Sequence, residues 1–449
     1  MSLSRRSFMT TVAGISAGAA ADRLFAAGSQ SRILGANDRV RVGIVGFSDR
    51  CRNSLLPPLV AYSKELNFEV VGVSDIWNRR RDEGVAYIRK LSGATVPAAR
   101  NNEELYETYK PDAVIVSTAD FQHALHTVEA VKAGCDVYVE KPFAETMADA
   151  RVALETVKAS DKIVQIGSQR RSGVNYQAAN EYIRSGKFGP MCMVEMTWNV
   201  NQPGRWRRPA LVASIKESDT DWTRYQMNRP TAPWDPRKYL EYRLFWPYSS
   251  GIPGQWMCHQ IDTVHWFSGL AHPRSVAANG GIYVWKDGRK NCDTVTAVFD
   301  YGPLDDPSTG FQVVYMSRMT NSAGDVKEWY FSNGGKLDLD KNTVTPEGGL
   351  TARYASEMGM QPNLLPEFEL PQQKVEAGAN TGSDPMTSAH VRNWMECVRS
   401  RQAPNAPVTA GYNHSIACIM ATAALHTGLR SAFDEQTQEV KVGDKVFQY

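Results

Sequence analysis

The feature that most constrains the fold is an alternation of short apolar segments with amphipathic stretches between residues 38 and 168. Intervening stretches such as HALHTVEAVKAG carry apolar residues at three- and four-residue spacing, which is typical of helices. Parallel strands are joined by such crossover helices, which cover both faces of the sheet. We therefore expect a doubly wound parallel sheet of the α/β class, with strands at RVRVGIVG, FEVVGVSD, DAVIVST, DVYVEK and KIVQIGS.

A different pattern begins at about residue 169. Segments such as DTVTAVFDY and GFQVVYMSRM alternate apolar and polar residues, which is typical of antiparallel strands with one face in water. We expect residues 169–449 to form a second, α+β domain with a large open, mostly antiparallel sheet. Within it, residues 199–247 form an insertion rich in Trp, Arg and Pro. Aromatic faces beside arginines suit stacking against sugar rings, and they equally suit buried packing or an oligomer contact.

The N-terminus has the pattern of an export signal. Arg5 and Arg6 precede a weakly apolar stretch from Phe8 to Ala21 that is rich in Gly and Ala. This stretch is too short for a membrane-spanning helix, which needs about 20 residues. It predicts a twin-arginine signal peptide over residues 1–30, and therefore a periplasmic or secreted protein whose mature form has no membrane span. An ordinary basic N-terminal helix is the alternative interpretation.

Charge and cysteine usage exclude several classes of protein. The chain has 50 Lys and Arg against 48 Asp and Glu, a net charge of +2, and no basic stripe interleaved with aromatic residues. A nucleic-acid partner is therefore not expected. Its seven cysteines form no Cys-x-x-Cys pair, so we predict neither a disulfide framework nor a zinc site. The sequence also lacks metalloprotease histidine motifs, phosphate loops and serine-hydrolase elbows, and we expect no metal site.

The turn after the first predicted strand departs from a familiar rule. A dinucleotide-binding Gly-x-Gly-x-x-Gly turn would place glycine at positions 46, 48 and 51, and only Gly46 is present. Phe47 follows it. Ser48 and Cys51 are small side chains, which limits the loss of close backbone approach and of helix packing. The turn is therefore a degenerate version of the motif.

Polar residues at the ends of the next strands extend the predicted ligand crevice. Asp75 ends the second strand, where a carboxylate binds the ribose diol of a dinucleotide and favours NAD. The arginines at 79–81 leave NADP open as the cofactor. Ser117 and Thr118 follow the third strand, and ligands of such sheets bind outside the carboxyl ends of the strands.

The fourth strand ends in Glu140-Lys141-Pro142, which places an ammonium group in the same crevice. A partly desolvated lysine there can act as an acid–base group or hold a substrate hydroxyl. Together with HALHTVEAVKAGCDVYVEKPFAET, VQIGSQRR and CHQIDTVHW, this element resembles the Gfo/Idh/MocA family, the glucose-fructose oxidoreductase and inositol dehydrogenase superfamily. The resemblance implies a Rossmann domain over residues 38–168, NAD(P)-dependent hydride transfer at a sugar or polyol carbon, and a dimer or tetramer formed through the open sheet.

The same resemblance implies site residues. Lys141 is then the catalytic lysine and His259 the histidine of the second domain, although a satisfied core histidine is the alternative. Gln255 stands one helical turn before His259, where dehydrogenase members have Asp, and as a neutral group it can only hydrogen-bond the imidazole. Asp262 either takes over the orienting role or caps internal polar groups. The predicted cofactor-binding residues are Gly46, Phe47, Ser48, Asp75, Ser117, Thr118, His123, Glu140, Lys141 and Gln169.

Export bears on the choice of function, because free nicotinamide cofactors are scarce outside the cytoplasm. We expect an exported oxidoreductase that holds its NAD or NADP tightly and acts on a sugar, polyol or glycoside carbinol. One alternative is a redox-cycling glycosidase with no net turnover of the cofactor. The other is a carbohydrate-binding descendant of the family without catalysis.

Overall fold

The computed structural model describes residues 38–306, 308–372 and 384–448. The predicted signal peptide, residues 1–30, lies outside them, and so do Arg5 and Arg6. Among the residues that are described, no helix is both long and apolar enough to cross a membrane.

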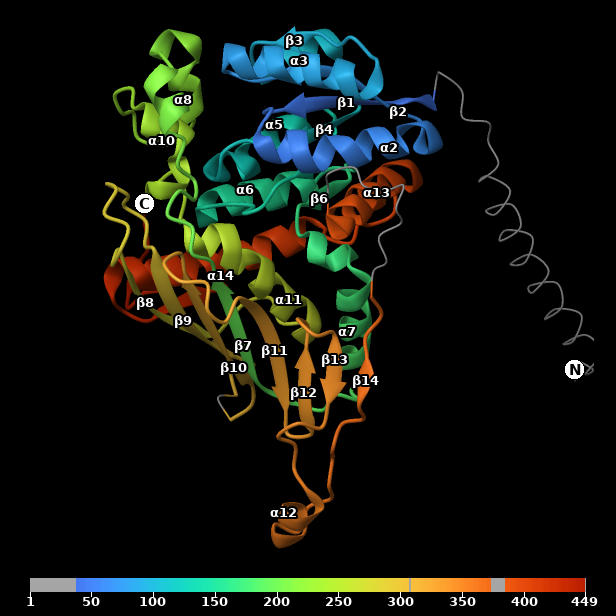
Figure 1. The fold of residues 1–449 in the computed structure, drawn as a ribbon, viewed down its shortest axis with the longest axis vertical. Coiled ribbons are helices and arrows are strands. Elements are labelled where there is room, and N and C mark those ends of the chain that lie inside the picture. The colour runs from blue at the N-terminus through green and yellow to red at the C-terminus, as the bar shows by residue number, and fades with distance from the viewer. Residues whose placement is uncertain (1–37, 307, 373–383, 449) are drawn as a thin grey trace, which may run out of the picture. The chain divides into compact units, whose positions relative to one another are not determined.

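The first sheet has six strands in the order β3-β2-β1-β4-β5-β6, the order of a doubly wound dinucleotide-binding fold (Figure 1). Strands β4 and β5 are buried along their whole length because helices cover both faces. The strands are β1 (Val40–Val45), β2 (Phe68–Ser74), β3 (Ala98–Ala99), β4 (Ala113–Val116), β5 (Asp136–Val139) and β6 (Val164–Ile166). The helical segments are η3 (Cys51–Leu55), α2 (Leu56–Leu66), α3 (Asn78–Ser92), α4 (Asn102–Glu104), η4 (Leu105–Tyr109), η5 (Asp120–Gln122), α5 (His123–Lys132) and α6 (Met147–Lys158).

The second sheet has eleven strands in the order β14-β13-β12-β11-β7-β10-β9-β8-β15-β16-β17. Only the β7–β10 pair is parallel among the described neighbours. The strands are β7 (Met191–Asn199), β8 (Ser275–Gly281), β9 (Thr294–Tyr301), β10 (Phe311–Arg318), β11 (Val326–Ser332), β12 (Gly335–Asp338), β13 (Thr343–Thr345), β14 (Phe368–Glu369), β15 (Ser431–Asp434), β16 (Glu439–Val442) and β17 (Lys445–Val446). The predicted fold class, a Rossmann sheet followed by a large, mostly antiparallel sheet, is confirmed.

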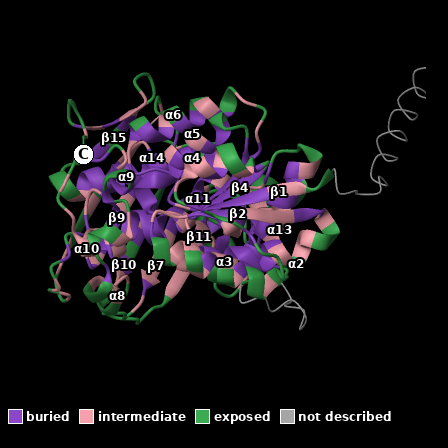
Figure 2. Cartoon of the chain, turned by 90° about the horizontal axis from the view of Figure 1, so that it is seen from above, coloured by how far each residue is buried: buried purple, intermediate pink, exposed green. Residues whose placement is uncertain are grey.

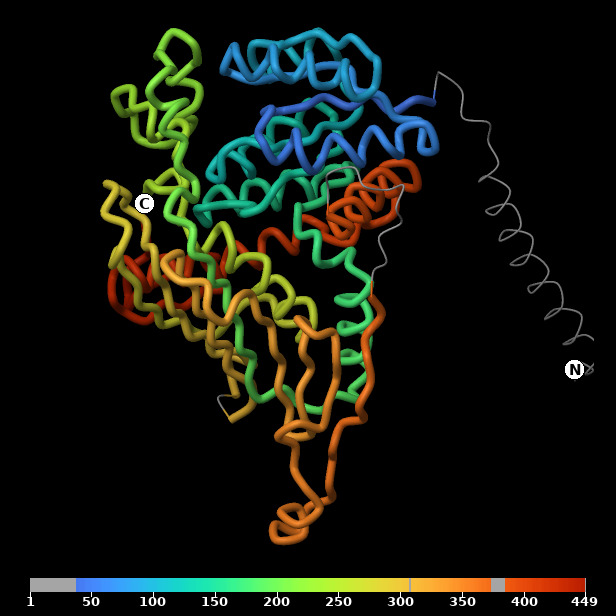
Figure 3. Tube along the Cα trace, in the orientation of Figure 1, coloured from blue at the N-terminus to red at the C-terminus, as the bar shows by residue number. Residues whose placement is uncertain are grey.

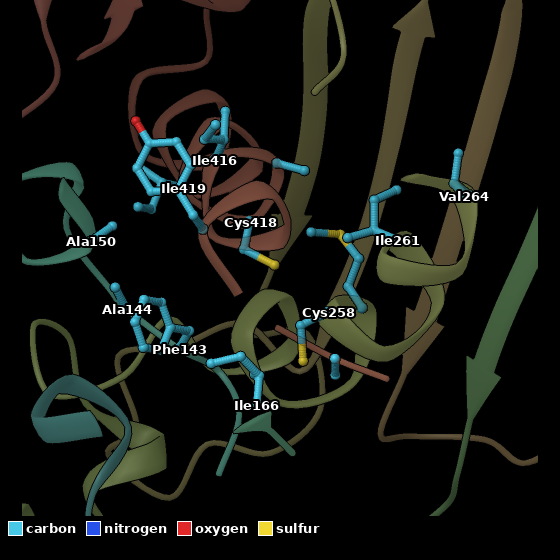
Figure 4. Packing of buried hydrophobic residues seen from close by; sticks show 14 of the residues in the cluster. Phe143, Ala144, Ala150, Ile166, Cys258, Ile261, Val264, Ile416, Cys418 and Ile419 are labelled. Carbon is cyan, nitrogen blue, oxygen red and sulfur yellow. The ribbon is translucent and has the colours of Figure 1, made fainter. Parts of the chain in front are cut away.

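Two helices fill the space between the sheets. In β10 every second residue is buried, and the buried side packs with helices α11 and α14 into the main core. Figure 4 shows Phe143 and Ile166 gathered with Cys258 of α11 and Cys418 of α14, so one core joins both sheets. The helical segments of this part are η6 (Gln169–Ser172), α7 (Val174–Arg184), η9 (Pro253–Met257), α11 (Cys258–Ser268), α12 (Ala352–Glu357), α13 (Pro385–Ser400) and α14 (Val408–Thr427).

Helix α13 packs on the first sheet although it lies late in the sequence. Its Trp394 and His390 rings contact the Tyr138 ring of β5 edge-on, with centroids 5.9 and 5.8 Å apart. The Gln165 side chain of β6 donates to the His390 carbonyl at 2.7 Å. Figures 1 and 3 show this late segment, in red, beside α2. The apolar face of α13 thus covers an N-terminal element.

The insertion at 199–247 forms short helices over the ends of β2 and β4. They are α8 (Pro209–Ser214), η7 (Glu217–Asp219), α9 (Trp222–Gln226), α10 (Pro236–Leu240) and η8 (Tyr242–Leu244). A separate aromatic core holds them, in which Tyr225 meets Phe121 and Tyr239 meets Trp77, with centroids 5.4 and 6.2 Å apart. Figure 2 shows β4 and α11 buried, whereas α8 is exposed or intermediate throughout. Buried packing therefore accounts for part of the aromatic residues in the insertion.

Candidate active site

Two neighbouring cavities lie at the carboxyl ends of the parallel strands. The first cavity, about 660 Å³, is lined by the turn after β1, the ends of β2 and β4, and the insertion. The second cavity, about 910 Å³, is lined by the end of β5, the start of α11 and the loop 201–208. Ser48, Ser117 and Thr118 line both cavities. The two spaces therefore share a wall made of the β1 turn and the end of β4.

The turn after β1 keeps its shape with a single glycine. Gly46 has φ = +83°, and a Cβ there would lie 2.7 Å from Cγ2 of Thr118 and 3.0 Å from the Ser117 carbonyl oxygen. Ser48 Oγ hydrogen-bonds Ser117 Oγ and accepts from the Cys51 N–H at 3.2 Å. The serine thus ties the turn to β4 and caps the helical segment that follows. Two motif glycines are replaced by residues that still support the turn.

Asp75 is held at the end of β2 with its carboxylate beside the first cavity. Its Oδ2 accepts from the Phe47 N–H and its Oδ1 from the Trp77 N–H, both at 2.9 Å. Burial raises the pKa of Asp75. Each carboxylate oxygen has a second lone pair, so the group can still accept from a ligand hydroxyl.

The arginines after β2 have partners within the protein. Arg80 pairs with Asp49 at 2.9 Å, Arg79 pairs with Glu83 at 2.7 Å, and Arg81 donates to the Asp75 carbonyl at 2.8 Å. Such pairing leaves them less suited to a ribose 2′-phosphate.

The first cavity fits a nicotinamide dinucleotide. Its glycine turn leaves no space for a Cβ, Asp75 stands at the ribose position, and Thr118 Oγ1 is buried without a partner among the described residues. An orphaned buried hydroxyl at such a place is satisfied when a polar ligand binds.

The insertion closes over the first cavity through polar contacts as well as aromatic ones. Arg208 pairs with Asp49 at 3.1 Å, and Arg224 pairs with Glu103 at 2.7 Å. The Gln122 side chain donates to the Tyr225 carbonyl at 2.7 Å inside the protein. A ligand in this cavity is therefore covered by the insertion.

Lys141 and His259 meet in the second cavity from different parts of the chain. Lys141 follows β5, and its Nζ donates to the Gln255 carbonyl at 2.9 Å. The preceding Glu140 is buried and pairs with Arg50 at 2.9 Å; although burial opposes it, Arg50 and Lys141 lower the pKa of Glu140. The His123 Nδ1 donates to the Pro142 carbonyl at 2.7 Å. Burial lowers the pKa of His123, so this neutral ring holds the Lys141 loop in place.

His259 is set against an aromatic wall. Its ring stacks on Trp198 with centroids 5.7 Å apart and an interplanar angle of 23°, and Trp198 in turn stacks on Trp256 at 5.9 Å. Burial and the positive charges of Lys141 and Arg170 hold the pKa of His259 well below its usual range. Within the described part of the chain, its nitrogens form no hydrogen bond. The ring is therefore neutral at physiological pH and can accept a proton.

Gln255 and Asp262 do not contact His259 as the spacing suggested. The π-helical turn η9 precedes α11, so the four-residue spacing does not put Gln255 on the His259 face. Instead, Gln255 donates to Asp120 at 2.6 Å and accepts from Arg243 at 2.8 Å. Asp262 accepts two hydrogen bonds from Arg171, at 2.8 and 3.0 Å. The predicted hydrogen bond of Gln255 to the imidazole is therefore wrong, whereas the contact of Asp262 with Arg171 agrees with one of its two predicted roles, the capping of an internal polar group.

Gln169, a predicted site residue, lines the second cavity, and its Oε1 is buried without a partner among the described residues. Other residues of the two cavities were not predicted from the sequence. Arg243 and Trp206 also line the second cavity, whereas His126 lines the first one and its Nδ1 donates to the Glu129 carboxylate at 2.8 Å. Arg243 and Trp206 come from the irregular insertion, where spacing carries no signal, and His126 lies within helix α5.

Comparison with known proteins identifies relatives of the first domain. Residues 40–168 match the model of GFO_IDH_MocA, the oxidoreductase family with an NAD-binding Rossmann fold. An inositol 2-dehydrogenase of Rubrobacter xylanophilus is 30% identical over 161 residues, which are 34% of this chain and 42% of that protein. A D-glucoside 3-dehydrogenase of Escherichia coli is 29% identical over 153 residues, 33% of this chain and 40% of that protein. The chain thus matches about two fifths of the length of these relatives.

Solved structures extend the likeness to the second domain. The WlbA dehydrogenase of Bordetella pertussis, in complex with NADH and UDP-GlcNAcA, has a TM-score of 0.62 at 15% identity and covers 88% of this chain and 98% of that chain. At that identity the likeness shows the fold. Residues 40–168 thus match a family of NAD-binding oxidoreductases, and the predicted class of cofactor, NAD, is confirmed.

Proposed function

We propose that the protein oxidises and reduces an alcohol carbon of a sugar, polyol or glycoside. The observation that carries this proposal is the meeting of Lys141 and His259 in one cavity that shares a wall with the dinucleotide cavity. The similarity to an inositol dehydrogenase and a glucoside dehydrogenase supports a cyclic polyhydroxy substrate.

The two side chains suit the two demands of such a reaction. A bound nicotinamide dinucleotide supplies the hydride acceptor or donor. The neutral imidazole of His259 can take the proton that leaves the carbinol oxygen during oxidation and return it during reduction. The Lys141 ammonium, fixed by the Gln255 carbonyl, can hydrogen-bond the same oxygen and stabilise its negative charge.

Asp75 and the paired arginines favour NAD over NADP. The carboxylate can accept the ribose hydroxyls and would repel a 2′-phosphate, while Arg80 is already engaged with Asp49. The proposal is therefore a preference for NAD(H).

The insertion supports tight retention of the cofactor, because it covers the first cavity with aromatic packing and ion pairs. Retention would suit the proposed twin-arginine export to the periplasm or beyond, where free cofactor is scarce. A retained cofactor must be restored within the catalytic cycle, either by a second substrate or, in a redox-cycling glycosidase, by the same substrate. The proposed assembly is a dimer or tetramer through the open sheet.

The proposal is tested on the purified full-length chain. The nucleotide released by denaturation is identified, and myo-inositol and methyl glucosides are then added to the native protein while the near-ultraviolet absorbance of reduced nicotinamide is followed. A lasting change in absorbance supports net oxidoreduction. Release of methanol without a lasting change supports the glycosidase, and a protein that binds sugar but no dinucleotide would be a carbohydrate-binding descendant.

A further inference from the structure

The loop between β7 and α8 contributes one cationic and one aromatic side chain to the second cavity. Arg205 and Trp206 both line it. Trp206 has φ = +65°, a left-handed conformation that a bulky side chain rarely adopts. Turn hydrogen bonds hold this conformation, from the Arg205 N–H to the Gln202 carbonyl and from the Arg207 N–H to the Gly204 carbonyl, both at 3.0 Å. A strained backbone that is held in this way and aims a side chain into a ligand cavity is typical of a functional site.

The Trp206 ring is part of the aromatic wall that carries His259. It packs against Trp256 at 5.3 Å, and Trp256 stacks on Trp198, which stacks on His259. Rigid indole surface beside the proton acceptor suits the apolar face of a sugar ring.

The charges that face the second cavity are unbalanced. Arg50 pairs with Glu140, and Arg208 pairs with Asp49. The other ionisable groups around the cavity are His123, Lys141, Arg205, Arg243 and His259.

Two of these cations lack a carboxylate partner. Arg243 has Asp120 Oδ1 behind it at 3.8 Å, whereas Arg205 and Lys141 form no ion pair with any residue that the structure describes. The only side-chain hydrogen bond that Arg205 donates within this part of the chain goes to Gln202 Oε1, at 2.9 Å. Desolvation and the positive charges of Arg243 and Arg208 lower the pKa of Arg205, so this guanidinium lies among like charges. Its planar fork fits a carboxylate.

We propose that the substrate is an acidic sugar, a hexuronic acid or its glycoside, whose carboxylate binds Arg205 while its ring lies on Trp206. The inference rests on the proposed function, because it names the substrate class of the same site. Lys141 is assigned to the reacting oxygen, which leaves Arg205 as the cation of this cavity that forms no ion pair with any described residue and can bind one negative charge. A sugar phosphate, with two charges and three oxygens, is the competing ligand that the test separates.

The experiment compares matched ligands on the protein with its bound dinucleotide. Calorimetric titrations use methyl β-D-glucopyranoside, methyl β-D-glucopyranosiduronate and glucose 6-phosphate, together with the galacto forms of the first two. We expect the uronate of at least one pair to bind about tenfold more tightly than its neutral partner and more tightly than the phosphate. Arg205→Gln is expected to abolish that advantage and Arg205→Lys to keep part of it, because the lysine retains charge without the fork.

A control and a second readout separate the two proposals. Arg353→Gln removes an arginine that is 79% exposed on α12 and should leave the uronate advantage intact. The inference is overturned if the acid and its neutral partner bind equally or if the phosphate binds more tightly. It is also overturned if neither acid binds or if the uronate advantage survives Arg205→Gln. Cofactor reduction is recorded separately: uronate binding that needs Arg205 without any reduction refutes the proposed function alone, and reduction by neutral sugars without a uronate advantage refutes the inference alone.

Discussion

The two cavities differ in how their charges are used, although one insertion helps to build both. Around the first cavity, Arg80 and Arg224 each face a carboxylate and the insertion packs as an aromatic core, whereas the Arg208–Asp49 pair lines both cavities. Around the second, Arg205 and Lys141 have no carboxylate partner among the described residues. We infer that the paired charges and packed rings retain the ligand of the first cavity, and that the unpaired charges of the second cavity recognise a ligand that is exchanged.

The largest effect is expected at Lys141, because the proposed function places the reacting oxygen beside this residue in the second cavity. Lys141→Met removes the ammonium from the reacting oxygen and should lower the rate of cofactor reduction by about 10²–10⁴-fold. The amount of bound dinucleotide should stay unchanged, since the side chain does not line the first cavity. Rapid-mixing absorbance and nucleotide content measure the two quantities. A variant that keeps a tenth or more of the rate would contradict the assignment.

Gly46→Ala should act on the first cavity instead. The new Cβ would lie 2.7 Å from Thr118 Cγ2 in a left-handed conformation, so the turn must move. We expect the affinity for dinucleotide to fall about tenfold or more. The matched control is Gly93→Ala, which has φ = +77° but open space around its Cβ. Equal loss of bound nucleotide in both variants would show that general backbone strain, and not the turn, is responsible.

Arg208→Gln tests whether the insertion retains the cofactor. The Arg208–Asp49 pair is partly exposed, with side chains 45% and 46% accessible, so its contribution is small. Dinucleotide release, followed by dialysis against a nucleotide scavenger, should become about two- to fivefold faster. Arg100→Gln removes a surface pair with Glu104 on the first domain and should not change the rate. Equal rates of dinucleotide release from both variants would show that the Arg208–Asp49 pair does not retain the cofactor.

The smallest effect concerns a carboxylate behind the second cavity. Burial, together with the negative charge of Asp120, raises the pKa of Glu145 from 4.5 to about 7 in the folded protein. Between these values the folded chain keeps a proton that the unfolded chain loses, so the stability it contributes is complete below pH 4.5 and is lost as the pH rises through about 7. Glu145→Gln should therefore raise Tm by about 2–4 °C at about pH 8 and give a clearly smaller gain near pH 5. A gain of the same size at both values would contradict this titration.

Much of the fold could be predicted from local patterns, and much of the site could not. Strands β1, β2, β4, β5 and β6 match the alternating segments, whereas β3 has two residues and no periodicity. The helices of the insertion span three to six residues, and their position depends on distant partners such as Asp49. Gln255 was misplaced because a π-helical turn changes the register of a helix without any signature in residue spacing.

The meeting of Lys141 and His259 depended on the family resemblance, because strand and helix periodicity say nothing of how two domains face each other. The sequence alone could not distinguish Arg205 and Trp206 from the other arginines and tryptophans of the insertion. Their importance follows from a positive φ and from the absence of an ion pair among the described residues, and both are tertiary properties.

The central claim is that a retained dinucleotide in the first cavity serves a substrate that is exchanged in the second. The most direct measurement is a single-turnover experiment on the full-length protein, purified and then gel-filtered without added cofactor. We expect near-stoichiometric bound NAD(H) whose absorbance changes when a carbohydrate alcohol is added, with the nucleotide still attached to the protein afterwards. A protein that emerges without dinucleotide and turns over only with freely exchanging cofactor would contradict it.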